Sequence, residues 1–541
     1  MRVDGRPEGL RPSMAWLHAW SGLLLGWLLY AVFFTGTLSY FRDEIDVWMK
    51  PELHASVPRD LSPERAIDGL RRLAPGATTW TLELPGARTT SIQASWRERG
   101  AAPGRAGTRR AELDAATGEV IAPRATRGGD FLYRFHFELH ALPRTWARWI
   151  VGSATMVMFV ALLSGVITHK KIFADFFTFR PRKGQRSWLD AHDATAVLGL
   201  PFHVVITFSG LLLSMNTLMP WGVDAVYKGD TQAFASERRG GVAPPSPAPR
   251  TGDAGRAASR DDTGVVPLTA LAPLLAQART RWPEHGVGSI VVQQPDTARA
   301  IIELREGGGR SLLDRGAGER MRFDGATGER LEGPAVAVPS GALAVYNVLT
   351  APHLGRFAGP SARWLLFVAG VIGTAMVATG LVLWVVKRLP ERRRLGRTPR
   401  GHRLVEVLNI AAIAGLSVAT ASYFWSNRLI PADLPQRADW EIHGFFGMWG
   451  LCLAHAAFRR HRAAWREQLG LAALLFASLP VVDPLTGGAG LARSIAQGQW
   501  SVAGFDLAML VLAVLHGCLA FGLRQPTTPP APVARGRERS P

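Results

Sequence analysis

Long apolar runs constrain this chain more than any other feature. Eight of them are long enough, or nearly so, to cross a hydrocarbon layer about 30 Å thick. A bilayer interior offers no partners to backbone N–H and C=O groups, so such runs fold as helices. The sequence therefore predicts a mainly α, polytopic membrane protein of about eight spans, at residues 16–40, 147–168, 190–218, 362–386, 404–425, 440–458, 467–483 and 503–523.

The formal charge of +19 follows the same plan. Basic clusters lie at the start of the chain and after every second apolar run, near residues 170–186, 387–403, 459–466 and from 524 onward. This alternation is typical of the positive-inside bias, and it predicts that both termini are cytoplasmic. Membrane orientation accounts for most of the charge, so we expect membrane lipid, and no nucleic acid, as a partner.

Two polar segments between the apolar runs resemble each other. Residues 43–146 and 219–360 each show a helical stretch, then strand-like alternation, then a turn written DAATGEVI or FDGATGERL. In both turns an Asp and a Thr-Gly pair separate two strands. We expect two small α+β domains on the outer side, inserted between spans 1 and 2 and between spans 3 and 4.

The repeat extends into the membrane segments. An offset of 174 residues aligns His18 with His192, and it places Gly36 of FFTGTL on Gly210 of TFSGLL. The stretch from His140, HALPRTWARW, likewise resembles the stretch from His353, HLGRFAGPSARW. The first four spans therefore read as two copies of span, outer domain, span.

The organisation that follows divides the chain into seven parts. They are span 1 at 10–42, outer domain 1 at 43–146, spans 2 and 3 with a basic turn at 147–218, outer domain 2 at 219–360 with a disordered linker near 240–260, span 4 at 361–387, a four-span unit at 403–523 and a tail at 524–541. The four-span unit shows no duplication, and its role stays open.

Histidines gather in the first four spans. If residues 188–214 form one helix, His192 and His203 return to nearly the same face about 16 Å apart. Histidine at membrane depth is costly without a partner, which favours a functional interpretation. Two histidines stacked in this way could each ligate one of two haems.

Six histidines lie at two predicted depths. Those at the inner ends of spans are His18, His169 and His192, and those nearer the outer side are His140, His203 and His353. A six-coordinate b-type haem needs two axial imidazoles. We expect an inner haem held by His192 with His169 or His18, and an outer haem held by His203 with His140 or His353.

Other interpretations of these histidines remain open. A neutral imidazole can be satisfied across a helix interface, and imidazole also suits Zn or Cu. His136 and His140, four residues apart with Glu138 between them, form the local pattern most typical of a metal site. His54, His285, His402 and His461 lie in polar segments, where we predict no special role for them.

The ordered set of motifs resembles a known family. The outer segments look like PepSY domains, and LHAWSGLLLG, HDATAVLGLPFHVVITFSGL and PHLGRFAGPSARW are similar to the PepSY-associated transmembrane family. The block GVITHKKIFADFFTFRPRKGQRSWLDAH resembles the inner-membrane ferric-siderophore reductases of that family. The resemblance implies a haem b protein of the bacterial inner membrane that reduces ferric siderophore at the periplasmic face and releases ferrous iron.

The electron donor is not visible in the sequence. The chain has no Gly-rich dinucleotide or Walker motif, so quinol or a separate reductase is the expected donor. The competing hypotheses are a polytopic transporter and a PepSY binding scaffold without haem.

Overall fold

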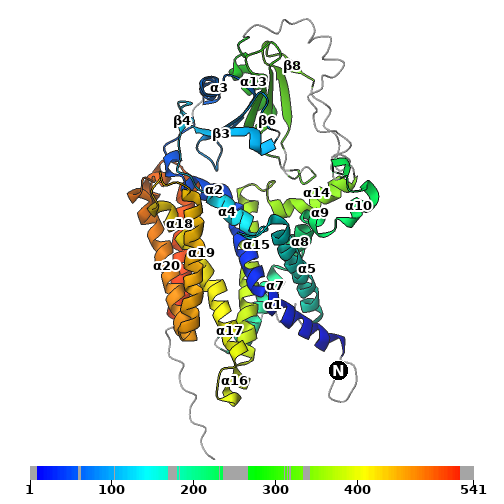
Figure 1. Ribbon diagram of the computed structural model, residues 1–541, viewed down its shortest axis with the longest axis vertical. Coiled ribbons are helices and arrows are strands. Elements are labelled where there is room, and N and C mark those ends of the chain that lie inside the picture. The colour runs from blue at the N-terminus through cyan, green and yellow to red at the C-terminus, as the bar shows by residue number, and fades with distance from the viewer. Residues whose placement is uncertain are drawn as a thin grey trace, which may run out of the picture.

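The computed structural model describes residues 9–58, 62–102, 104–168, 179–181, 183–230, 232–234, 266–309, 311–313, 315, 318–332 and 341–523. Helices form a long bundle, and a β-sheet with two covering helices lies beyond one end of it (Figure 1). Helix α1 begins at the opposite end of the bundle (Figure 1). We call the end that carries the sheet the sheet end, and the opposite end the far end.

The first copy and the second copy together build the N-terminal half of the bundle. α1 packs against α5 and α15, α15 packs against α7, and α8 packs against α5 and α14. Their bounds are α1 Leu10–Leu38, α5 Arg144–Thr168, α7 Gln185–Leu198, α8 Leu200–Leu213, α14 Gly341–Leu354 and α15 Pro360–Lys387.

The expected single helix over residues 188–214 is wrong. α7 and α8 are separate helices that meet at Gly199 with a bend of 66°. Pro201 in the first turn of α8 has no backbone N–H and cannot continue the hydrogen-bond ladder of α7. His192 and His203 therefore do not share one straight helical face.

The C-terminal unit contains four long helical segments. These are α17 Arg400–Ile410 continued through the π-helical turn η4 Ala411–Gly415 into α18 Leu416–Leu429, then α19 Arg437–Phe458, α20 His461–Leu485 and α22 Trp500–Gly522. By length and composition, six helical segments of the described chain could cross a membrane, or seven if the bent α7–α8 pair is one span. α19 is not among them because Glu441, His443 and His455 lower its hydropathy.

The strands form one antiparallel sheet of eight, in the order β4-β3-β2-β1-β5-β6-β7-β8. Each outer segment supplies four, and the segments join where β1 pairs with β5, with Trp80 opposite Val292. The strands are β1 Ala77–Glu83, β2 Ile92–Glu98, β3 Thr108–Leu113, β4 Val120–Ile121, β5 Val287–Gln293, β6 Ile301–Glu306, β7 Arg320–Asp324 and β8 Arg330–Leu331. The two outer segments thus share a sheet.

They also share a hydrophobic core. Helices α3 (Ser62–Leu73) and α13 (Leu271–Arg281) bury apolar side chains on the sheet, and one cluster joins Trp80 and Ile92 of the first segment to Val292 and Phe323 of the second. The two similar turns also match. Asp114 and Asp324 each accept two backbone N–H bonds from the turn that follows, at 2.8–3.0 Å.

Loops fix the sheet to the bundle. In the β1–β2 loop, Arg88 forms a bidentate pair with Glu44 and also donates to the backbone carbonyl of Tyr40. In the β6–β7 loop, the guanidinium of Arg315 lies 5.5 Å from the ring centre of Tyr346 on α14.

The shorter helices are η1 Ser39–Phe41, α2 Arg42–Trp48, η2 Pro51–Leu53, η3 Gly104–Gly107, α4 Gly128–Phe135, α9 Met215–Leu218, α10 Trp221–Tyr227, α16 Leu389–Leu395 and α21 Leu491–Ala496.

A buried charged group joins the C-terminal unit to the N-terminal half near the sheet. The Arg428 guanidinium donates to Asp483 at 2.5 Å and lies 4.0 Å from the ring centre of Trp48 on α2. The indole N–H of Trp48 donates to Asp506 at 2.9 Å. A buried charge with a charged partner is tolerated only in good geometry, so this contact fixes the position of the C-terminal unit.

Candidate cofactor sites

Four histidines of the N-terminal half form two facing pairs. His18 and His192 lie near the far end, with ring centroids 6.1 Å apart, and we call them the inner pair. His136 and His353 lie near the sheet end, with ring centroids 5.9 Å apart, and we call them the outer pair. His18 and Gly36, which packs against the outer pair, are separated by about 27 Å along α1 at 1.5 Å per residue.

The four histidines share one local arrangement. Each ring packs on a glycine that follows a serine or threonine, and each Nδ1 is hydrogen-bonded to the backbone carbonyl four residues before that glycine. The contacts are His18 with Gly165 and Ala161 O at 2.9 Å, His192 with Gly380 and Met376 O at 3.0 Å, His136 with Gly36 and Val32 O at 2.7 Å, and His353 with Gly210 and Ile206 O at 2.9 Å.

The closeness of the rings requires glycine most strictly at Gly36 and least strictly at Gly210, where an added Cβ would lie 3.3 Å from the ring of His353. A Cβ on Gly36 would lie 2.6 Å from His136 Cε1, and one on Gly380 would lie 3.1 Å from His192 Cε1. A side chain at these positions would displace the imidazole. The repeated small residue is therefore a cradle for a histidine ring, in addition to any role in helix packing.

This arrangement selects one tautomer. An Nδ1–H that donates to a carbonyl leaves the Nε2 lone pair as the metal-binding atom, and histidine ligands in metalloproteins are held in this way. Burial lowers the pKa of His353 to about 4, and it also lowers the pKa of His136. Both rings of the outer pair are thus neutral near pH 7, the form that binds metal.

The spacing of each pair fits haem iron. An imidazole nitrogen binds a metal at about 2.0 Å, which places the centroids of two trans imidazoles about 6 Å apart. The observed 6.1 and 5.9 Å agree with that value. The facing pairs therefore fit a b-type haem with two histidine ligands.

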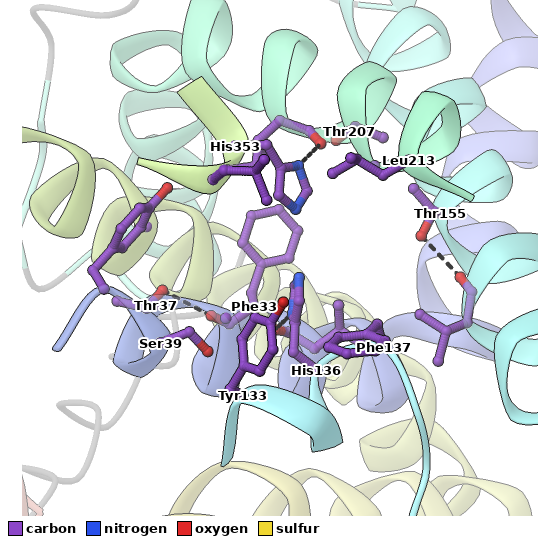
Figure 2. A pocket seen from close by; sticks show the side chains of 18 of the residues that line it. Phe33, Thr37, Ser39, Tyr133, His136, Phe137, Thr155, Thr207, Leu213 and His353 are labelled. Carbon is purple, nitrogen blue, oxygen red and sulfur yellow. Dashed lines mark hydrogen bonds between the residues drawn. The ribbon is translucent and has the colours of Figure 1, made fainter. Parts of the chain in front are cut away.

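A cavity of about 510 Å³ surrounds the outer pair. Figure 2 shows His136 and His353 pointing toward each other across it, with Phe33, Tyr133 and Phe137 beside them. Sites for small molecules and cofactors commonly occupy about 300–1,000 Å³. The cavity is thus large enough for a bound group between the two rings.

Polar groups line part of the same cavity. Arg42, Arg88, Arg148 and Arg356 line it together with Asp43, and Tyr40 contributes a hydroxyl. Three of these arginines are also ion-paired, Arg42 with Asp130, Arg88 with Asp43 and Glu44, and Arg148 with Glu138. In the part of the chain that the structure describes, Tyr40 Oη and Arg42 Nε are buried without a hydrogen-bond partner. Buried donors of this kind fit the carboxylates of a haem or of an anionic ligand.

The predicted site residues fall into three groups. His18, His192 and His353 lie in the facing pairs. His140 packs against Phe446 of the C-terminal unit at 5.2 Å, and His203 is fully buried beside Phe33 with both ring nitrogens unpartnered among the described residues. His169 lies outside the described residues, as does most of the basic turn that follows it.

His136 takes the position that we expected for His140. The alignment of the two copies by the similar words HALPR and HLGRF paired His140 with His353. The structure instead makes His136 the counterpart of His353. The number of residues before the next span would have indicated this, because His136 precedes the start of α5 by eight residues and His353 precedes the start of α15 by seven. The spacing of His136 and His140 suggested a metal site on one helix face. In the structure, the histidine that faces His136 is His353 of the second copy.

The apolar helices and the shared sheet define a multi-pass helical membrane protein with an antiparallel sheet beyond one end of its bundle. A family model described as the PepSY-associated TM region matches residues 15–387. The chain belongs to this family, which confirms the resemblance seen in the sequence. A search of curated proteins returns no match.

Proposed function

We propose that the protein is a membrane oxidoreductase that binds two b-type haems, one at each histidine pair. The observation that carries this proposal is the repetition of one ligand arrangement at two depths. In both pairs an Nδ1 is held by a backbone carbonyl, a glycine admits the ring, and the ring centroids lie 6.1 or 5.9 Å apart, a separation that would let both imidazoles hold one metal ion. Helix packing alone does not require the same arrangement four times.

The residues of the chain have separate roles in this proposal. The histidines hold iron, and the Ser/Thr-Gly cradles fix ring orientation. Bound haem would supply one-electron transfer, with a potential set by its axial ligands and burial. Apolar side chains between the two levels, among them Leu29, Met158 and Met376, keep water away from the interior.

We infer that the substrate is a ferric chelate, such as a ferric siderophore, reduced at the sheet end. Four arginines and one carboxylate, that of Asp43, line the cavity around the outer pair, and this excess of positive charge in the lining suits an anionic ligand. With the sheet on the periplasmic side of a bacterial inner membrane, the described ends of the chain lie on the cytoplasmic side. α1 begins at the far end (Figure 1), and the end of α22 is joined to the start of α20 by the Arg462–Leu523 hydrogen bond.

An optical spectrum tests the haem assignment. The purified protein should show a b-type spectrum after dithionite reduction, with about two haems per chain by pyridine haemochrome. His192→Ala should remove the inner haem and His353→Ala the outer haem, while His140→Ala keeps both. A colourless protein, or two haems in all three variants, would refute the assignment.

A ferrous-iron trap tests the activity. Reduced protein mixed anaerobically with a ferric chelate should be reoxidised, and a colorimetric ferrous chelator should report one ferrous ion per electron lost. The His353→Ala variant should lose most of this activity because it lacks the haem nearest the cavity. Unchanged ferrous production in that variant would place reduction elsewhere.

A further inference from the structure

An aromatic cluster lies beside the inner pair, at the far end of the bundle. Its members are Trp20 on α1, Trp384 on α15 and His402 on α17, and we call it the inner aromatic cluster. The Trp20 and Trp384 ring centroids are 6.4 Å apart, and those of Trp384 and His402 are 5.4 Å apart at a right angle. The cluster therefore joins the N-terminal half to the C-terminal unit.

Two polar atoms of this cluster are buried and unsatisfied. Trp384 Nε1 and His402 Nε2 have no hydrogen-bond partner among the described residues, and the His402 side chain is only 9% exposed. Buried polar groups are normally hydrogen-bonded, so each such exception calls for a missing partner. An indole N–H can only donate, whereas a neutral imidazole nitrogen can accept. Together they offer one donor and one acceptor.

The cluster adjoins the inner pair along two helices. Trp384 follows Gly380, the glycine that cradles His192, by one helical turn, a rise of about 6 Å. Trp20 contacts Trp384 from α1, the helix that also carries His18. A molecule bound at the cluster would thus lie close to a haem held by the inner pair.

We propose that the inner aromatic cluster binds a lipid-soluble hydroquinone and that this quinol is the electron donor. A phenolic hydroxyl both accepts and donates a hydrogen bond, which matches Trp384 Nε1 and His402 Nε2. The Arg388 guanidinium covers the Trp384 ring at 3.7 Å, while Trp20 is 38% exposed on the bundle surface and offers an aromatic face to the ring of a quinol arriving from the lipid. This inference rests on the proposed function, because it requires a haem at the inner pair.

The residues around His402 suit the release of protons. Glu406 lies one turn further along α17, is 3% exposed, and is ion-paired with Arg392 at 2.8 Å and with Arg403 at 3.5 Å. His461 also faces it, at 3.9 Å. Two guanidinium groups and one imidazole thus surround this single carboxylate, so the charge around His402 is net positive.

The reaction balances with ferric iron as the oxidant. The quinol loses two O–H protons and two electrons and becomes the quinone. His402 Nε2 accepts the proton of the hydroxyl bound beside it and passes it to water at the far end, and the proton of the second hydroxyl leaves to water directly. The two electrons leave one at a time through the inner pair, and two ferric ions at the sheet end become two ferrous ions.

Reduction by a quinol analogue tests this inference in purified full-length protein. Anaerobic decylubiquinol should reduce the haem of wild-type protein within seconds. In His402→Leu and Trp384→Phe, we expect this rate to fall at least tenfold while haem content and reduction by dithionite stay unchanged. The matched controls are His516→Leu and Trp425→Phe, which alter a buried histidine and a partly buried tryptophan elsewhere in the C-terminal unit and should reduce at the wild-type rate.

A binding measurement adds a readout that does not depend on turnover. Short-chain ubiquinone should quench tryptophan fluorescence of the wild type in a saturable way, and His402→Leu should weaken that affinity at least tenfold. Absence of haem from the wild type would overturn the proposed function itself. Two outcomes would overturn the quinol site alone and favour a separate reductase as donor. The first is haem that dithionite reduces but the quinol does not, and the second is a His402→Leu variant that keeps the wild-type reduction rate and ubiquinone affinity.

Discussion

The substitution Gly36→Ala tests the cradle arrangement with a change of one methyl group. A Cβ at residue 36 would lie 2.6 Å from both Cε1 and Nδ1 of His136, whereas ordinary contacts begin at 3.4 Å. The imidazole would have to move by about 0.8 Å, and its 2.7 Å hydrogen bond to Val32 O would be lost or lengthened. Because loss of a partner that orients a ligand typically lowers metal affinity by about 10–100-fold, we expect the outer haem to bind that much more weakly.

Gly210→Ala is the matched control for this substitution. Residue 210 cradles His353, the other ligand of the same haem, but a Cβ there would lie 3.3 Å from the ring, only about 0.1 Å inside an ordinary contact. Alanine is also the better helix former, so neither variant should lose helical stability for intrinsic reasons.

Haem titration of the two apo-proteins compares them directly. The outer haem should bind Gly36→Ala at least tenfold more weakly than wild type, with the inner haem unaffected, and Gly210→Ala should resemble wild type. Equal affinity in all three proteins would refute the cradle argument, and equal loss in both variants would show that the ring contact distance does not decide affinity.

Three further predictions concern other parts of the chain. His203→Leu should keep two haems per chain by haemochrome count, since the ring of His203 contacts Phe33 and Phe202 and not one of the paired histidines; loss of one haem would restore it as a ligand. His54 donates from Nε2 to Val47 O and accepts at Nδ1 from the backbone N–H of Ala489, and burial lowers its pKa below the ordinary 6.5. The unfolded chain therefore binds a proton at His54 before the folded chain does as pH falls below about 6.5, so the melting temperature should drop between that pH and pH 5. The drop should be smaller in His54→Gln. Parallel curves of melting temperature against pH for the two proteins would contradict this. Arg428→Met leaves the buried Asp483 carboxylate without its cation, and should cost about 3–5 kcal/mol of stability in denaturant unfolding; a change below about 1 kcal/mol would show that water replaces the cation.

Much of the membrane architecture could be predicted because hydropathy and charge act locally along the chain. The repeat of span, outer domain and span was visible because His18, Gly36, Gly165 and their counterparts keep their order and spacing. The predicted turns around Asp114 and Asp324 were also visible, since the Thr-Gly pair and the aspartate define the turn by themselves.

What the sequence did not reveal depends on contacts between distant segments. The joining of β1 to β5 requires two edge strands from separate domains to meet, and no local pattern marks which edges pair. The bend at Gly199 was present as Gly-Leu-Pro but was outweighed by the continuous apolar run. His402 was assigned to a polar segment, and its burial follows only from the packing of α17 on α15.

The ligand pairs have a consequence for how the chain assembles. Each pair takes one histidine from the first copy and one from the second, and β1 and β5 join the two copies in the same way outside the bundle. The chain is thus an intramolecular dimer with the two proposed haem sites at its interface. A half-length relative carrying one copy could build both centres by pairing with itself, and in this chain haem loading would lock the two halves together as the last step of folding.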